Sequence, residues 1–173
     1  MSPSTPLLQI PVGVVIERRK AKSQWVDYVW RPVAVLPGVP DAQPWSVLEE
    51  NSEVTHFYAG SAEVRLYPSE TAMYRDNLGS GTPSLWVVLR PTDLEPPYEV
   101  VAVTADPSEG EGYTAAGPDI VDYVPMPETV RETVEAFIAE HHVEQTFFKR
   151  QRDRADPEAL ARCAAAQKKD RDT

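Results

Sequence analysis

Apolar side chains at every second position are the feature that most constrains this chain. In the stretch LLQIPVGVVIERRK they stand at Leu8, Ile10, Val12, Val14 and Ile16. A period of two places these side chains on one face of a β-strand, whereas an α-helix would distribute them around its axis. The sequence therefore predicts a half-buried strand that ends between Glu17 and Lys20.

The same alternation continues through the first two thirds of the chain and predicts a sheet. The second expected strand, 24–36, contains Pro32, which forces an edge position or a bulge. The strands expected after it are a hairpin or kinked strand over 53–68, then 84–93, 98–106 and 119–127. Segment 84–93 is apolar on both faces, so we expect it to be central in the sheet.

Helical patterns interrupt and follow the strands. A short helix is expected over 69–81, with Ser69 as its N-cap, and an acidic glycine-containing loop over 109–119. A long helix is expected from Glu128 to position 150, since Pro and acidic residues suit a first turn. At 100° per residue, its inward stripe contains Val130, Val134, Phe137, Ile138, His141, Gln145 and Phe148.

The expected fold class is α+β. One domain over 1–150 has an antiparallel sheet of about six strands, open or closing towards a barrel, packed against a long C-terminal helix over 128–150. A charged tail over 151–173 follows, partly helical or mobile. The tryptophans in expected strands, Trp25, Trp30 and Trp86, should be core residues, and Trp45 in the proline-rich loop 36–45 should be the most exposed.

Charge is unevenly distributed within the net charge of −10. Residues 1–92 carry a charge of −1, residues 93–144 carry −12, and residues 145–173 carry +3. An acidic field repels nucleic acid and anionic membrane, so we expect neither as a partner. Apolar runs such as LWVVL are too short to span a bilayer, and the first residues lack a basic n-region, so the expected location is cytoplasmic.

The stretch HHVEQTFFKRQRDR, 141–154, is the expected interaction site. Val143 and Phe147 fall on the face of the long helix opposite its inward stripe, beside a basic run. Either the helix bends or ends near His142, so that another face turns inward, or these residues form an exposed patch that meets another protein. The second alternative predicts a partner-binding surface of Val143, Phe147, Lys149, Arg150, Arg152 and Arg154.

Patterns that carry catalysis are weak in this sequence. It contains no GxSxG, GxxxxGK[ST] or HExxH motif, and adjacent His141 and His142 point about 100° apart on a helix. His56 would need a helix to cross its strand before it could share a metal with His141. We therefore expect no catalytic residues, no metal and no cofactor, and the sequence favours a protein that is not an enzyme.

Three segments resemble a known bacterial family. They are PVGVVIERRKAKSQWVDYVWRPVAVLPG at 11–38, LWVVLRP at 85–91 and HHVEQTFFKRQRDR at 141–154. Together they look like the recurring segments of the domain-of-unknown-function family three-three-zero-five. The resemblance implies genes near those of molybdenum-dependent formate dehydrogenase. Some members are labelled molybdopterin-guanine dinucleotide biosynthesis protein A, although the glycine-rich nucleotide loop that such an enzyme needs is missing here.

Two functions follow from the residues and the resemblance together. The first is a non-catalytic cytoplasmic accessory protein that assists assembly or maturation of a molybdenum-dependent formate dehydrogenase. Its expected partner is another protein, such as a formate dehydrogenase subunit or one of its maturation factors. The second is an enzyme or carrier in molybdopterin-guanine dinucleotide biosynthesis. An enzyme needs a concave pocket with convergent polar groups, whereas a docking protein needs only an exposed apolar patch rimmed by charge.

Overall fold

The structure is a computed structural model that describes residues 4–115 and 117–143. The chain divides into two compact units, Met1–His142 and Val143–Thr173, and the strands and helices below belong to the first. Its described residues form seven β-strands and three α-helices, so the α+β class is confirmed.

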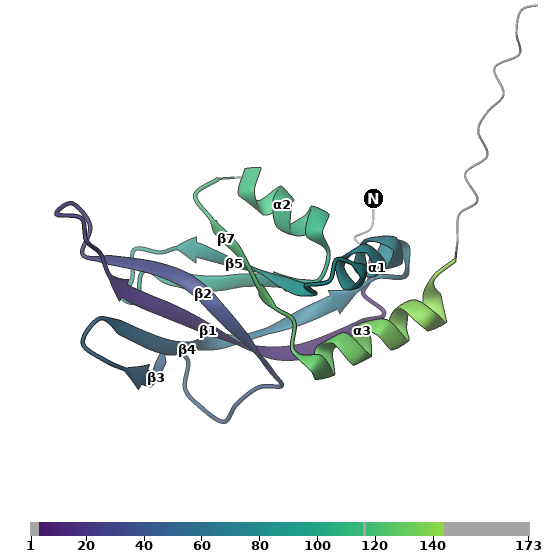
Figure 1. Cartoon of the computed structure of the whole chain (residues 1–173), viewed down its shortest axis with the longest axis horizontal. Helices are drawn as coiled ribbons and strands as arrows, with labels where there is room; N and C mark the ends of the chain where they lie inside the picture. Colours follow the sequence, from purple (N-terminus) through teal and green to yellow (C-terminus); the bar gives the residue numbers. More distant parts are fainter. Residues whose placement is uncertain (1–3, 116, 144–173) are drawn as a thin grey trace, which may run out of the picture. The chain divides into compact units, whose positions relative to one another are not determined.

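The first sheet has four antiparallel strands in the order β2-β1-β4-β3 (Figure 1). They are β1 (Leu8–Lys20), β2 (Tyr28–Pro37), β3 (Ser46–Glu50) and β4 (Val54–Leu66). The predicted burial of one face of β1 is confirmed, because Val12, Val14 and Ile16 are completely buried. Strand β3 was not predicted, because SVLEE is short and lacks a sustained apolar alternation.

Two irregularities shape this sheet. The pairing of β1 with β2 shifts register opposite Pro32, so the predicted bulge is present. The pairing of β1 with β4 shifts beside Gly60, whose φ of 128° few other residues adopt. Strand β4 is therefore one long kinked strand rather than a hairpin.

The second sheet has three antiparallel strands in the order β6-β5-β7. They are β5 (Ser84–Pro91), β6 (Tyr98–Thr104) and β7 (Ile120–Pro125), and β5 is central as predicted. The prediction of a single sheet of about six strands was wrong, and so was the alternative in which that sheet closes towards a barrel. Strand β4 lies beside β6 and β2 lies beside β7, but no described strand pairing joins the two sheets. Prolines at positions 32 and 37 leave β2 with fewer donors for such a pairing.

Helix α1 (Thr71–Gly79) follows a 3₁₀ turn, η1 (Pro68–Glu70), close to the predicted range. Ser69 does not cap it, because this residue lies inside the preceding turn. Helix α2 (Pro107–Ala115) stands where an acidic loop was predicted, so that prediction was wrong. The carboxylate of Asp106 accepts hydrogen bonds from the backbone N–H groups of Ser108, at 2.8 Å, and Glu109, at 3.4 Å, which starts the helix.

Helix α3 (Glu128–His141) begins where predicted but does not extend to position 150. His142 has an extended backbone, and its ring bonds to Thr71 Oγ1 at 3.0 Å and Arg75 at 3.1 Å. These bonds to α1 hold His142 outside the helix. The inward residues Val130, Val134 and Phe137 are buried as predicted.

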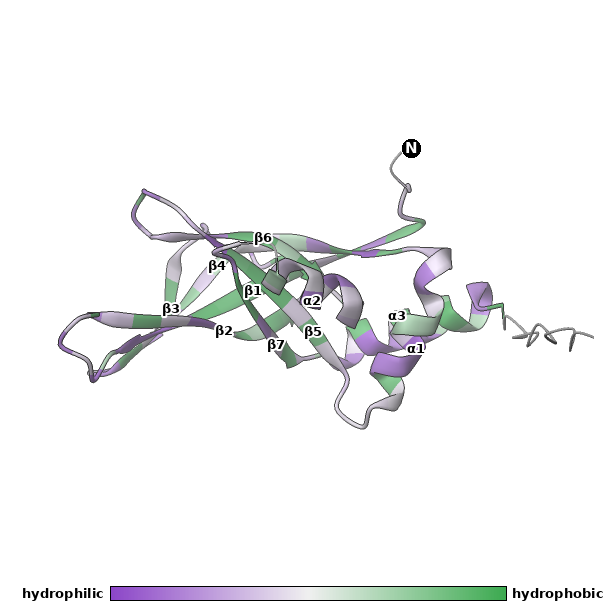
Figure 2. Ribbon diagram, turned by 90° about the horizontal axis from the view of Figure 1, so that it is seen from above, coloured by the Kyte–Doolittle hydropathy of each residue, from purple (hydrophilic) through white to green (hydrophobic). Residues whose placement is uncertain are grey.

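The core gathers residues from both sheets and from α1 and α3. Helix α3 packs against α1 at one end of the strands (Figure 1), where the rings of Tyr74 and Phe137 are 6.3 Å apart. The β1–β2 turn lies at the other end of the strands. Figure 2 shows hydrophobic colouring along the central parts of the strands, whereas more hydrophilic residues occur near the turns.

Candidate protein-binding site

The turn between β1 and β2 exposes a group of apolar side chains. Trp25 is 86% exposed, Val26 53%, Val29 52% and Tyr28 38%, and we call these four residues the hairpin patch. They make up one third of the twelve exposed large hydrophobic residues found in the described chain. The prediction that Trp25 is a core residue was wrong, because it lies in the turn, which a hydrogen bond from Ala21 N–H to Asp27 O closes at 3.0 Å.

An aromatic cluster packs around Arg18 on the face of the hairpin directed towards the second sheet, where Trp30 contacts Tyr98 of β6. The guanidinium carbon of Arg18 lies 4.6 Å from the ring centre of Tyr28 and 5.2 Å from the ring centre of Phe57. Trp30 stacks on Phe57 at 5.8 Å and contacts Trp45 at 6.1 Å. Trp45 is only partly exposed, so the prediction that it is the most exposed tryptophan was wrong. Cation–π contacts and ring packing give this end of the sheet a defined shape.

The opposite face of the hairpin carries a buried carboxylate. Glu17 is 5% exposed, and its Oε1 accepts hydrogen bonds from Nε of Arg19 at 3.2 Å and Nε of Arg31 at 3.1 Å. Its Oε2 lies 3.1 Å from Nε2 of His56. Burial by itself would raise the pKa of the Glu17 carboxyl, but the bonds from His56, Arg19 and Arg31 hold it below its ordinary value. Glu17 is therefore ionised at neutral pH.

His56 connects this carboxylate to a neighbouring strand. Its second ring nitrogen, Nδ1, lies 3.5 Å from a carboxylate oxygen of Glu49 on β3. His141 lies on α3, where its ring centre is 4.6 Å from that of Phe137, whereas His56 lies on β4 beside β3. No cluster of three or more potential metal ligands occurs within residues 4–115 and 117–143.

A shallow cavity of about 390 Å³ opens beside Glu17 on this face. Its lining residues are Glu17, Arg19, Lys20, Ala21, Lys22, Val29 and Arg31. Five of the nine Lys and Arg residues between positions 4 and 143 lie in the short stretch 18–31. The hairpin is therefore a local basic region, with apolar side chains beside it, in a strongly acidic protein.

The interaction surface predicted from sequence lies almost wholly outside the described residues. Of its six members, Val143 is described and is 78% exposed. The others, Phe147, Lys149, Arg150, Arg152 and Arg154, fall in 144–173, outside the described residues. The structure does show that α3 ends at His141, so the alternative in which the helix ends near His142 is confirmed in that respect. The docking role of these six residues stays a prediction.

Sequence reasoning began the second strand at position 24, whereas β2 begins at Tyr28, so it missed the exposure of Trp25 in the turn. The reason is that WVDYVW alternates as a strand would. The signal that distinguishes it is KAKSQ at 20–24, a polar stretch between two apolar runs, which marks a turn. The same stretch supplies both lysines that line the cavity next to Glu17.

Comparison with known proteins gives one match. Residues 11–152 match the model of a family described as Protein of unknown function (DUF3305). No curated protein and no solved structure matches the chain. None of the helices within the described part has the length and apolar character needed to cross a membrane.

Proposed function

The chain belongs to the DUF3305 family of proteins of unknown function, and from that premise we propose that it is a non-catalytic accessory protein. It binds another protein through its β1–β2 hairpin. The observation that carries the proposal is the hairpin patch, four apolar side chains within five consecutive positions, with Trp25 86% exposed.

The physical argument concerns where apolar surface is left in water. Single exposed apolar residues are common, but a group that includes a tryptophan has a cost in water that a partner removes by covering it. Trp, Tyr and Arg are also the residues that dominate binding energy at protein interfaces. The hairpin carries all three, and the contact of Arg18 with Tyr28 joins the hairpin patch to the aromatic cluster.

The resemblance to this family suggests the first partners to test. They are a subunit of a molybdenum-dependent formate dehydrogenase, or a maturation factor of that enzyme, in the cytoplasm. In this role the protein assists assembly of the enzyme by protein contact and carries out no chemistry of its own.

The test compares matched variants in capture of purified formate dehydrogenase subunits and maturation factors. Val29→Ser and Trp25→Ser alter the hairpin patch, whereas Val39→Ser and Leu94→Ser alter residues outside it with comparable exposure, 54% and 76%. We expect the hairpin variants to lose capture and the control variants to retain it, with all four melting like the wild type. Equal capture by all four variants would refute the proposal. Saturable binding of molybdopterin-guanine dinucleotide would instead favour a role in cofactor biosynthesis.

A further inference from the structure

Arg19 and Arg31 bond to Glu17 in a way that leaves the terminal nitrogens of each guanidinium group available to a ligand. Arg19 and Arg31 each contact Glu17 through Nε alone. Within the described chain, their terminal nitrogens make no hydrogen bond, and their side chains are 49% and 54% exposed. Glu17 is thus a positioning residue that fixes two guanidinium groups at one edge of the cavity.

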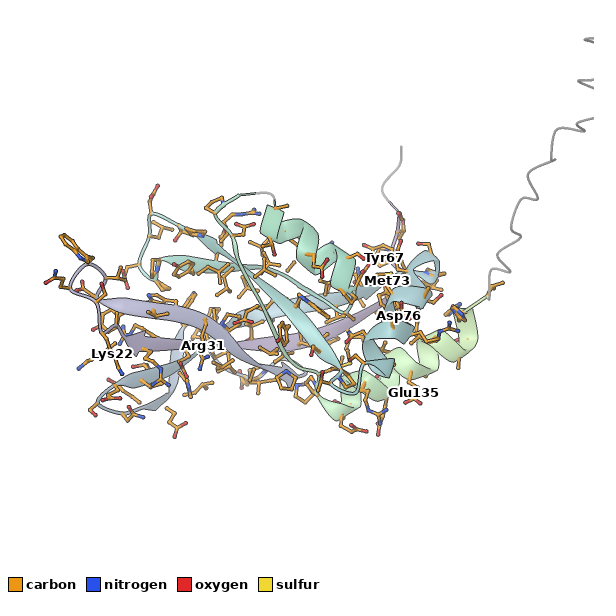
Figure 3. All side chains as sticks on the ribbon, turned by 45° about the horizontal axis from the view of Figure 1, so that its top comes forward. Lys22, Arg31, Tyr67, Met73, Asp76 and Glu135 are labelled. Atoms are coloured by element: carbon orange, nitrogen blue, oxygen red, sulfur yellow. The ribbon has the colours of Figure 1, made fainter. Side chains whose placement is uncertain are left out.

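Two lysines complete the basic rim. Lys20 and Lys22 line the same cavity and are exposed, and neither forms an ion pair with any described residue. The same cavity is therefore lined by four cations and one buried carboxylate. Figure 3 shows Lys22 and Arg31 together on the hairpin, well separated from the labelled residues of the helical end, Met73 and Asp76.

We infer that this arginine clamp, defined as Glu17, Arg19, Arg31, Lys20 and Lys22, binds the carboxylate side chains of a short acidic segment of the partner protein. A guanidinium group matches a carboxylate through two parallel N–H···O bonds, which an ammonium group cannot reproduce. The inference rests on the proposed function and specifies which chemical groups of the partner are recognised. Val29 lines the same cavity, so the segment carries an apolar residue beside its acids.

The surroundings of the clamp limit the occupant to a short peptide segment. Glu49 lies 3.5 Å from His56 on the same face, and Glu50 and Glu53 are exposed nearby on β3 and the turn that follows it. A nucleic-acid duplex or an anionic membrane extends over a wide area and would meet these acids. A segment with two or three carboxylates fits within the basic rim and avoids them.

The experiment measures the binding of fluorescein-labelled poly-L-glutamate to the full chain by fluorescence anisotropy at low ionic strength. The informative variant is the double substitution R19K/R31K, which keeps the charge and removes both guanidinium groups. The matched control is Arg65→Lys, an exposed arginine on β4 that is outside the clamp.

We expect R19K/R31K to weaken binding by about tenfold or more, because hydrogen bonds to charged groups are lost, and Arg65→Lys to bind like the wild type. Equal affinities for the double variant and the wild type would mean that positive charge alone accounts for the binding of poly-L-glutamate, and this result would overturn the inference. Absence of binding by the wild type would overturn it too, as would tighter binding to phosphatidylglycerol vesicles than to poly-L-glutamate.

A second readout separates this inference from the proposed function. If R19K/R31K captures the partner protein as well as the wild type does, the clamp is not part of recognition and the inference fails, while the proposed function stands. If Val29→Ser and Trp25→Ser both retain capture, the proposed function fails, whatever the affinity for poly-L-glutamate. Capture that is weakened by both kinds of variant supports both proposals.

Discussion

Between Val12 and Ile16 every second side chain of β1 is completely buried, whereas Arg19 and Lys20, only a few residues further along the same strand, are exposed. Both halves of β1 pair with β2 and β4. The first half contributes to the common core with the helices and the second sheet. The second half extends to the turn, where Arg18 and its aromatic neighbours provide the inward packing. One half of the strand therefore stabilises the fold, and the other presents side chains to a partner.

The largest expected effect on stability distinguishes the helical end of the strands from the hairpin at their other end. Phe137→Ala removes a side chain that is 3% exposed and packs on Tyr74, so it should cost about 3 kcal/mol or more of unfolding free energy. Trp25→Ala should change stability by about 0.5 kcal/mol or less, because surface substitutions remove little packing. Urea denaturation followed by circular dichroism measures both. A large loss of stability in Trp25→Ala would mean that the hairpin patch is structural.

A second pair of variants tests the packing of α2, the helix that was predicted as a loop. A Cβ added at Gly110 would lie 2.4 Å from Cγ of Trp86, whereas a Cβ at Gly112 meets no atom within 4 Å. Gly110→Ala should therefore destabilise the protein by about 1–3 kcal/mol through overpacking. Gly112→Ala, in the same helix, should be neutral or stabilise it by up to about 1 kcal/mol. Equal melting temperatures for the two variants would contradict the packing of α2 on the sheet.

The helical end also contains a buried tyrosine that should make stability sensitive to alkaline pH. Burial raises the pKa of Tyr74 to about 12, from an ordinary value of 10.0. The folded state binds this proton more tightly than the unfolded state, so stability should fall as pH rises from 10.0 towards 12. Tyr74→Phe should remove this part of the decline. At neutral pH it should cost about 1 kcal/mol, since the Tyr67 N–H loses its acceptor.

The matched control for this titration is Tyr123→Phe, because Tyr123 is 66% exposed. The control should keep the alkaline decline of the wild type. A decline that is unchanged in Tyr74→Phe would show that another group is responsible. Chemical unfolding at neutral pH and between pH 10.0 and 12 provides the comparison.

The smallest expected effect is at the hairpin, in acid. The pKa of Glu17 is lowered in the folded protein, so its contribution is present above the ordinary value of 4.5 and is lost as pH falls through the folded value. Glu17→Gln should be less stable than the wild type at neutral pH by about 1 kcal/mol or less, because its arginine partners are half exposed. The difference should close in acid. Glu63→Gln, an exposed acid on β4, is the control, and a gap that widened in acid would contradict the assignment.

Local periodicity was sufficient to predict most of the strands. The buried positions of β1 and the inward residues of α3 were predictable, because one face of each element carries a regular apolar pattern. The central place of β5 was predictable because its segment is apolar on both faces. Helix α2 was not predictable in the same way. Its two glycines indicated a loop, but Gly110 serves close packing against Trp86, a tertiary effect that local sequence does not encode.

The candidate site was less predictable than the fold. Trp25 follows the alternation of its neighbours, so its place in an exposed turn depends on where β1 ends and β2 begins. Glu17 and Arg31 are far apart in sequence and meet through the register of two strands, which a one-residue slip would change. The division into two sheets likewise depends on which edges pair, and single-strand patterns carry no information on that point.

Hydrogen–deuterium exchange of the full chain, with and without the captured partner, tests the central claim most directly. If the β1–β2 hairpin is the binding surface, backbone amides within 20–31 should gain protection, while those of α1 and α3 should stay unchanged. Protection confined to the helical end, or to the segment 143–154, would contradict the claim and place recognition elsewhere in the chain.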